Sequence, residues 1–311
     1  MKPRSLAAVA MALTLAIGCA PALVPVQPEP GARVELWDES AKDRDLFYGV
    51  GGRELAPPDR PTFTLLERDP SGFSVTLDLR DKAGREWSAK LGEEAQSEVT
   101  ASRVVWAMGY HQVPSYYVPG FIVVEDGREK PEPAARLRPK VEWLDSQDTW
   151  SWYQNPFVGT QAYRGLLVLM MVINSTDLKE PNNTIYLRER AGERPSRWFV
   201  VKDLGATFGT TGRFGPKRND IEKFEEHGFI KGVRDGRVDF HYTGRHQALL
   251  DQITVDDVVW TCTRLSQLTD RQWDDAFRAG GYDEPTRQRY VARIKAKVQE
   301  GLALGRKEAR R

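Results

Sequence analysis

Residues 173–205 read INSTDLKEPNNTIYLRERAGERPSRWFVVKDLG, and they follow a strongly apolar run that ends at Ile173. Asp177 comes just after this run, Asn182 lies five positions later, and Asp203 directly precedes a Leu-Gly pair. Phosphoryl transfer needs one carboxylate to orient or deprotonate the attacking hydroxyl, and hard oxygen ligands such as an amide and a second carboxylate to hold Mg²⁺. The spacing therefore predicts a phosphoryl-transfer centre with Asp177 as the base and Asn182 and Asp203 as metal ligands.

Residues 177–182, DLKEPN, resemble the D-L-K-x-x-N catalytic loop of protein kinases, and residues 203–205, DLG, are similar to their D-F-G motif. Protein kinases carry His-Arg before the loop aspartate, whereas Ser175 and Thr176 stand at this place. This departure indicates the atypical branch of the kinase-like superfamily, which includes phosphoinositide kinases, HipA-type bacterial kinases and secreted Golgi-type kinases. The resemblance also implies that Lys179 contacts the transferred phosphate, with a solvent-facing lysine as the alternative.

The most regular β pattern lies upstream, in residues 62–91. Alternating apolar residues separated by two turn sequences predict three antiparallel strands. In kinases the first turn covers the nucleotide and the third strand carries the lysine that contacts its phosphates. The resemblance therefore implies that Ser71 and Gly72 offer backbone N–H groups to the phosphates, in place of a G-x-G-x-x-G loop, and that Lys90 is the strand lysine. An exposed strand lysine is the alternative for Lys90.

A helix is predicted over residues 93–108, because the segment has helical composition, acidic residues in its first turn and Gly109 after its end. The resemblance implies that a glutamate on this helix pairs with Lys90. Glu94 and Glu98 are four residues apart and share one face of the helix. We expect Glu98, which lies further into the helix, to make the pair, with Glu94 as the alternate and a solvated glutamate as the competing interpretation.

The rest of the chain completes an α+β pattern. Residues 163–173 predict a buried helix, a hairpin precedes Asp203, and apolar spacing near 3.6 predicts three C-terminal helices. Together with the resemblance, this order implies a two-lobed protein-kinase-like fold. Residues 34–140 would form a small lobe with an antiparallel sheet and one helix, and residues 141–311 a larger, mainly helical lobe.

The amino terminus has the features of an export signal. Lys2 and Arg4 precede an apolar run that is too short to span a bilayer, and the sequence LAIGC ending at Cys19 resembles a bacterial lipobox. We expect residues 1–19 to be a signal peptide, Cys19 to be lipidated and the proline-rich residues 20–33 to be a tether. The protein would then be anchored on the extracytoplasmic side of the cell envelope. A plain secretory signal is the alternative.

Charge and composition narrow the function further. Lys plus Arg number 45 and Asp plus Glu 44, so global charge gives no support for nucleic-acid binding. We expect an exported phosphotransferase that uses ATP and Mg²⁺, with a nucleotide and an unidentified phosphate acceptor as its partners. The alternative is a pseudokinase-like surface lipoprotein that binds a partner without turnover, because little ATP is present outside the cytoplasm. Cys262 lies in an apolar segment and is predicted to be a core residue.

Overall fold

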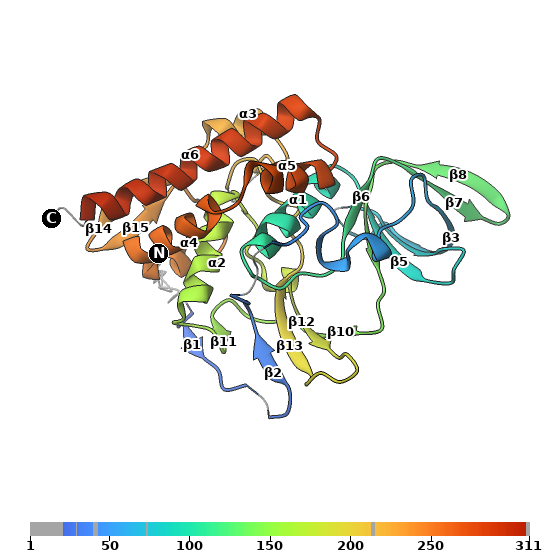
Figure 1. Cartoon of the computed structure of the whole chain (residues 1–311), viewed down its shortest axis with the longest axis horizontal. Helices are drawn as coiled ribbons and strands as arrows, with labels where there is room; N and C mark the ends of the chain where they lie inside the picture. The colour runs from blue at the N-terminus through green and yellow to red at the C-terminus, as the bar shows by residue number, and fades with distance from the viewer. Residues whose placement is uncertain (1–20, 29, 40–42, 73, 213–214, 309–311) are drawn as a thin grey trace, which may run out of the picture.

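A computed structural model describes residues 21–28, 30–39, 43–72, 74–212 and 215–308, and it has two lobes (Figure 1). A β-sheet with one helix forms the smaller lobe, and helices dominate the larger one. A second sheet of four strands extends from the junction of the lobes. The predicted α+β class is therefore confirmed, as are the two predicted lobes, a smaller one with a sheet and one helix and a larger, mainly helical one.

The small lobe is built on a seven-stranded sheet in the order β6-β9-β5-β4-β3-β7-β8. Its three central strands are the predicted antiparallel set, in which Leu77 and Leu79 face the core while Asp78 and Arg80 face solvent. Helix α1 (Glu94–Ala107) packs against β5, β6 and β9. The strands are β3 (Thr62–Asp69), β4 (Thr76–Arg80), β5 (Glu86–Leu91), β6 (Tyr116–Val118), β7 (Phe121–Glu125), β8 (Arg128–Glu132) and β9 (Ala135–Pro139).

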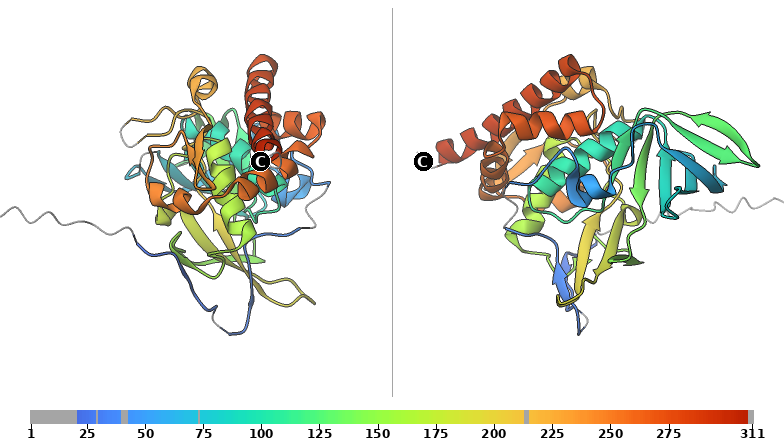
Figure 2. Two further views of the ribbon diagram at one scale, coloured as in Figure 1. Left: turned by 90° about the vertical axis from the view of Figure 1, so that its left-hand side faces the viewer. Right: turned by 45° about the vertical axis from the view of Figure 1, so that its right-hand side comes forward.

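The large lobe surrounds α2, whose central turns are fully buried, as the apolar sequence predicts. Helix α4 packs on α2, and α6 packs on α4 along the outside of the lobe (Figure 2). Capping boxes at Thr254 and Thr269 start α4 and α5, which agrees with the predicted helix starts. The helices are α2 (Gln161–Val172), α3 (Ile221–Glu226), α4 (Val255–Ser266), α5 (Asp270–Ala279) and α6 (Glu284–Glu308).

Short elements complete this lobe. Strands and turns alone are expected for residues 222–244, but the segment begins inside α3, which the side chain of Asp220 caps. Cys262 is fully buried, which confirms its prediction as a core residue. In the described part of the chain, every helix is too short or too polar to cross a membrane. The short elements of this lobe are β14 (Ile230–Arg234), β15 (Arg237–Phe240), η3 (Glu180–Asn182) and η4 (Gln247–Gln252). The helices η1 (Gly49–Gly51) and η2 (Arg53–Leu55) belong instead to the segment assigned to the small lobe, where η1 contacts α1.

The second sheet has the order β10-β12-β13-β2 and includes the predicted hairpin before Asp203. Its edge strand β2 comes from the start of the segment assigned to the small lobe, and it pairs in parallel with β13. The predicted tether is also attached in part, because β1 (Val24–Pro25) pairs with β11 (Gln154–Asn155). The signal peptide and Cys19 lie outside the described residues. The strands are β2 (Arg33–Glu35), β10 (Leu144–Asp148), β12 (Asn183–Arg188) and β13 (Ser196–Val201).

Candidate active site

A cleft of about 730 Å³ lies between the two lobes. Strands β4, β5 and β9 form its small-lobe wall, and β10, β12 and the end of β13 contribute the opposite wall. Lys90, Glu98 and Asp203 line the same cleft, although they come from three separate parts of the chain. The cleft therefore holds three of the residues that were predicted to form the site.

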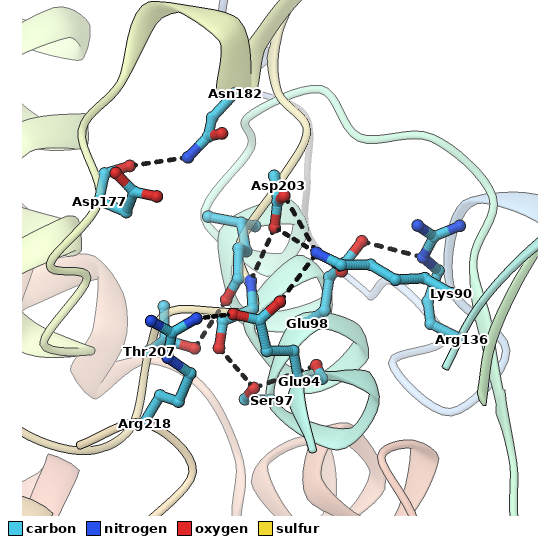
Figure 3. Close-up of polar contacts among 12 residues, drawn as sticks. Lys90, Glu94, Ser97, Glu98, Arg136, Asp177, Asn182, Asp203, Thr207 and Arg218 are labelled. Atoms are coloured by element: carbon cyan, nitrogen blue, oxygen red, sulfur yellow. Dashed lines mark hydrogen bonds and ion pairs between the residues drawn. The ribbon is translucent and has the colours of Figure 1, made fainter. Parts of the chain in front are cut away.

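Lys90 lies on the central strand β5 and is the centre of an ion-pair cluster (Figure 3). Its ammonium group lies 3.0 Å from Glu94 Oε2 and 3.3 Å from Glu98 Oε2. It also donates hydrogen bonds to both carboxylate oxygens of Asp203, at 3.1 and 3.0 Å. Burial favours the neutral amine, but the three carboxylates outweigh burial and raise the pKa of Lys90. Lys90 is therefore a buried cation at neutral pH and not an exposed strand lysine.

Both candidate glutamates of α1, Glu94 and Glu98, contact Lys90. The structure therefore does not assign the ion pair to one of them alone. Glu98 is 1% exposed, and its Oε1 also accepts from Arg138 Nη2 at 2.6 Å and lies 3.0 Å from Arg136 Nε. Glu94 pairs in addition with Arg218 from the segment that follows Asp203. Two carboxylates on one helical face thus bridge the strand lysine to different parts of the fold.

Asp203 lies where the chain leaves β13 and crosses helix α1. Burial works to raise the pKa of its carboxyl group, but Lys90 and then Arg138 outweigh burial, so the pKa lies below its ordinary value. The backbone of Gly205 passes close to α1, because a Cβ atom there would lie only 2.7 Å from Cβ of Glu94. Ser97 on the same helix donates to the Gly205 carbonyl at 2.7 Å. Glycine after Asp203 therefore lets this loop dock on the helix that bears the glutamates.

Asp177 and Asn182 lie in the loop between α2 and β12. Asn182 Nδ2 donates to the Asp177 carbonyl at 2.9 Å, and the Asn182 carbonyl accepts from the backbone N–H of Asp203 at 3.3 Å. In Figure 3, Asp203 lies between this pair and Lys90. The Asp177 carboxylate pairs with Lys179 at 2.7 Å. The structure thus brings Asp177, Asn182, Asp203 and Lys90 to one place.

The donor atoms at this place suit Mg²⁺. The hydrogen bond from Asn182 Nδ2 leaves the amide oxygen of that residue as an acceptor, and the Asp203 carboxylate has lone pairs beyond those used by Lys90. Mg²⁺ is commonly held by one or two protein oxygens together with water and substrate phosphates. In the described residues no three His, Cys, Asp or Glu side chains form a metal site. The two residues therefore fit a metal shared with a phosphate ligand and not a closed protein cage.

Ser71 and Gly72 lie apart from the other predicted residues. They form the turn between β3 and β4, and among the described residues that line the cleft neither of them occurs. The backbone N–H of Ser71 donates to Asp69 Oδ1 at 2.8 Å, a local turn contact of the kind that Asp favours. The expectation that Ser71 supplies a free N–H to a phosphate is therefore wrong for this structure.

Two arginines of the cleft are missing from the sequence prediction. Arg136 and Arg138 are two positions apart on β9 and point to the same side, toward Glu98. Arg138 Nη2 also donates to the carbonyl of Lys202 at 2.7 Å, which ties β9 to the residue before Asp203. Alternating arginines in a predicted strand near the lobe junction were the available signal. What they contact depends on pairing between strands that are far apart in sequence.

Lys202 makes the cleft sensitive to pH. Burial, Arg138 and Arg136 lower its pKa to about 8, against the smaller opposite effects of Glu98 and Asp203. The unfolded chain binds the Lys202 proton more tightly than the folded chain does, so this lysine lowers the free energy of unfolding below pH 8. The loss becomes smaller as the pH rises from 8 toward the ordinary lysine pKa, because the unfolded chain then releases the proton as well. We expect Lys202→Met to be more stable than wild type at pH 7, with the difference shrinking between pH 8 and about 10.5.

Urea unfolding of the two proteins across this pH range measures the difference. Lys231→Met is the matched control, because that lysine is exposed and lies on β14, away from the cleft. It should give a difference from wild type that does not change over the same interval. A constant difference for Lys202→Met would contradict the lowered pKa.

Comparisons with known proteins give structural matches only. No protein-family model and no curated protein sequence matches the chain. The Helicobacter pylori proinflammatory kinase CtkA matches with 11% identity and a TM-score of 0.46, over 79% of this chain and 98% of that chain. A Golgi casein kinase with Mn and ADP bound matches with 8% identity and a TM-score of 0.41, over 80% of this chain and 73% of that chain.

Proposed function

We propose that this protein is a phosphotransferase that uses ATP and Mg²⁺. The observation that carries the proposal is the contact of Lys90 with Asp203 in the interlobe cleft, together with the Asn182–Asp177 pair, which is joined to Asp203 through the Asn182 carbonyl. Lys90 and Asp203 are separated by 113 residues, so their contact is a property of the fold and not of a local turn. A structural ion pair alone would not require the adjacent carboxylate and amide of the loop.

Each residue has a role that follows from its position. Lys90, oriented by Glu94 and Glu98, binds nucleotide phosphates, while Asp203 and Asn182 hold the metal, which neutralises phosphate charge when bound. Asp177 accepts the proton of the attacking hydroxyl, since a general base needs only a hydrogen-bond distance to that group. In this proposal Lys179, whose ammonium group pairs with Asp177, contacts the transferred phosphate.

Thermal unfolding with a non-hydrolysable ATP analogue tests the nucleotide site. A ligand at 100 times its Kd stabilises the folded state by about 2.7 kcal/mol. We expect the melting temperature to rise with the analogue, and to rise further when Mg²⁺ is added. Radiolabel transfer from ATP to casein, histone and small hydroxyl compounds then tests turnover. The proposal is rejected if neither the analogue nor Mg²⁺ changes the melting temperature.

The alternative is a binding protein that keeps the site without turnover. The ion pairs of the structure favour this alternative. Lys90 donates hydrogen bonds to both carboxylate oxygens of Asp203, and the ammonium group of Lys179 pairs with the Asp177 carboxylate. A nucleotide would have to loosen this network before Asp203 shares a metal. Stabilisation by the analogue without any phosphate transfer to a broad acceptor set would select this alternative.

We also propose that the protein is exported and anchored by a lipid at Cys19. This proposal rests on the charged start, the short apolar run and the LAIGC sequence. Labelling of expressing bacteria with a fatty acid tests it. The label should appear on the wild-type protein and be lost in Cys19→Ala, and equal labelling of both would contradict the assignment.

A further inference from the structure

A second cavity, of about 640 Å³, lies behind helix α1, on the side away from the interlobe cleft. Helix α1, strand β6, the segment that includes η1 and η2, and the last residue of α5 surround it. The described residues that line it include four aromatic side chains, three prolines, three arginines and one aspartate. These charged residues give the lining a formal charge of +2, from three arginines minus one aspartate. The cavity therefore combines apolar walls with a surplus of positive charge.

Arg103 is the buried cation of this cavity. Its side chain lines the cavity and the residue is only 1% exposed. Nη2 donates to the Ser115 carbonyl at 2.6 Å, but Nε and Nη1 have no acceptor among the residues that the structure describes. Burial lowers the pKa of Arg103 to about 10, so the group stays charged at neutral pH. A buried charged donor without an acceptor is costly, and an anion relieves that cost.

Protein groups nearby do not supply this acceptor. Tyr116 and then Asp45 work to raise the pKa of Arg103, but Oδ1 of Asp45 accepts from the backbone N–H groups of Phe47 and Tyr48 at 2.9 and 3.1 Å. Gly49 lies directly on the guanidinium, because a Cβ atom there would be 2.3 Å from Cζ of Arg103. Glycine at this position lets the chain cover the cation closely while the side chain still lines the cavity.

The walls indicate what kind of anion fits. Phe47, Tyr48, Tyr116 and Tyr117 offer ring surfaces, and Arg53 and Arg60 are exposed cations beside them. Arg53 lies over the Tyr48 ring at 5.7 Å, and Arg103 over the Tyr116 ring at 5.8 Å. The volume is within the range of about 300–1,000 Å³ that is usual for small-molecule sites.

We propose that this cavity binds a small organic anion, an aromatic ring that carries a phosphate or carboxylate group. The ring packs between the aromatic walls, and the anionic group pairs with Arg103 and with the arginines at the rim. The ligand would lie against the rear of the helix whose other side bears Glu94 and Glu98. The site is separate from the proposed nucleotide cleft and does not depend on catalysis.

Phenyl phosphate and benzoate are the probes, measured by thermal unfolding at constant ionic strength. We expect at least one of them to raise the melting temperature in a saturable way, and to do so more strongly than inorganic phosphate or phenol. The probe that raises the melting temperature more shows whether the site prefers a phosphate or a carboxylate group. If neither has a saturable effect, or if inorganic phosphate alone has the same effect, the proposal is wrong.

Variants locate the binding. Arg103→Met keeps an unbranched, flexible side chain but removes the guanidinium and its charge, and we expect it to weaken probe binding at least tenfold. Arg264→Met is the matched control, because that arginine also stacks on an aromatic ring, Trp260 at 3.9 Å, but does not line this cavity. It should bind the probe as wild type does. Equal binding by Arg103→Met would overturn the proposal.

Two further variants keep the test decisive. Arg53→Gln changes an exposed side chain and should weaken binding several-fold even if Arg103→Met does not fold. Unchanged binding in Arg53→Gln would then count against the site. Lys90→Met should bind the probe normally, whereas loss of binding there would place the probe in the interlobe cleft. Failure of the nucleotide site would leave these results unchanged, so the two proposals fail separately.

Discussion

Replacing Asp203 with asparagine should lower phosphoryl transfer by about a thousandfold. Asp203 is the carboxylate that the structure places between Lys90 and Asn182, and asparagine removes the charge that attracts the metal while keeping the size of the side chain. Metal coordination stabilises transition-state charge by several kcal/mol, and about 4 kcal/mol corresponds to a factor of about 10³ in rate. The melting temperature should also lose its dependence on Mg²⁺ in the presence of the ATP analogue.

Initial rates of radiolabel transfer, together with circular dichroism to verify folding, measure this effect. Asp78→Asn is the matched control, because Asp78 lines the same cleft on β4, is exposed and lies outside the Lys90 cluster. Its rate should stay within about twofold of wild type, as expected for an exposed charge that has no ion pair among the described residues. A rate for Asp203→Asn close to that of Asp78→Asn would remove Asp203 from the proposed metal site.

Residues within single elements were predictable from the sequence. Lys90 follows from the alternation in β5, and Glu94 and Glu98 from the four-residue repeat on α1, because strand and helix periods decide which side chains share a face. The Asp177–Asn182 spacing likewise matches the short loop that the structure forms. These predictions needed only local geometry and the order of elements along the chain.

Contacts between distant segments were not predictable in the same way. One of the two candidate glutamates was expected to pair with Lys90, but the structure brings both to it, since Arg218 and the β9 arginines neutralise the surplus negative charge. Strand β2 pairs with β13 across about 160 positions of sequence, and no local pattern specifies that partner. The prediction for Ser71 is wrong for the opposite reason, which is a local contact. The side chain of Asp69 accepts a hydrogen bond from the N–H group that was expected to bind phosphate.

The side chains around Glu98 connect helix α1 to the loop that carries Asp203, and backbone hydrogen bonds connect that loop to the one that carries Asp177. Arg138 contacts Glu98 and the carbonyl of Lys202, so one guanidinium joins helix α1 to the residue before Asp203. Backbone hydrogen bonds from Thr176 to Ala206 and from Phe208 to Ile173 join the two loops of the large lobe. Displacing α1 would therefore break contacts to Lys90, Arg138 and the Asp203 loop at once. The geometry of the proposed metal site therefore depends on the position of this helix.

Replacing Asp177 with asparagine should reduce kcat by about 10² to 10⁴, the usual contribution of a general base, while nucleotide binding stays intact. The carboxylate lies beside Lys179, and its backbone carbonyl holds the amide of Asn182. Asparagine preserves that carbonyl and the size of the side chain but cannot accept the substrate proton. The effect should therefore appear in turnover and not in the melting-temperature shift caused by the ATP analogue and Mg²⁺.

Transfer rates and analogue-induced stabilisation, measured on the same preparations, separate these two effects. Asp251→Asn is the matched control, because Asp251 is an exposed aspartate of the same lobe on η4. It should keep both the rate and the stabilisation of wild type. If Asp177→Asn transfers phosphate as fast as this control, Asp177 is not the base. If it loses the stabilisation as well, its main contribution is to hold Asn182 in place for the metal.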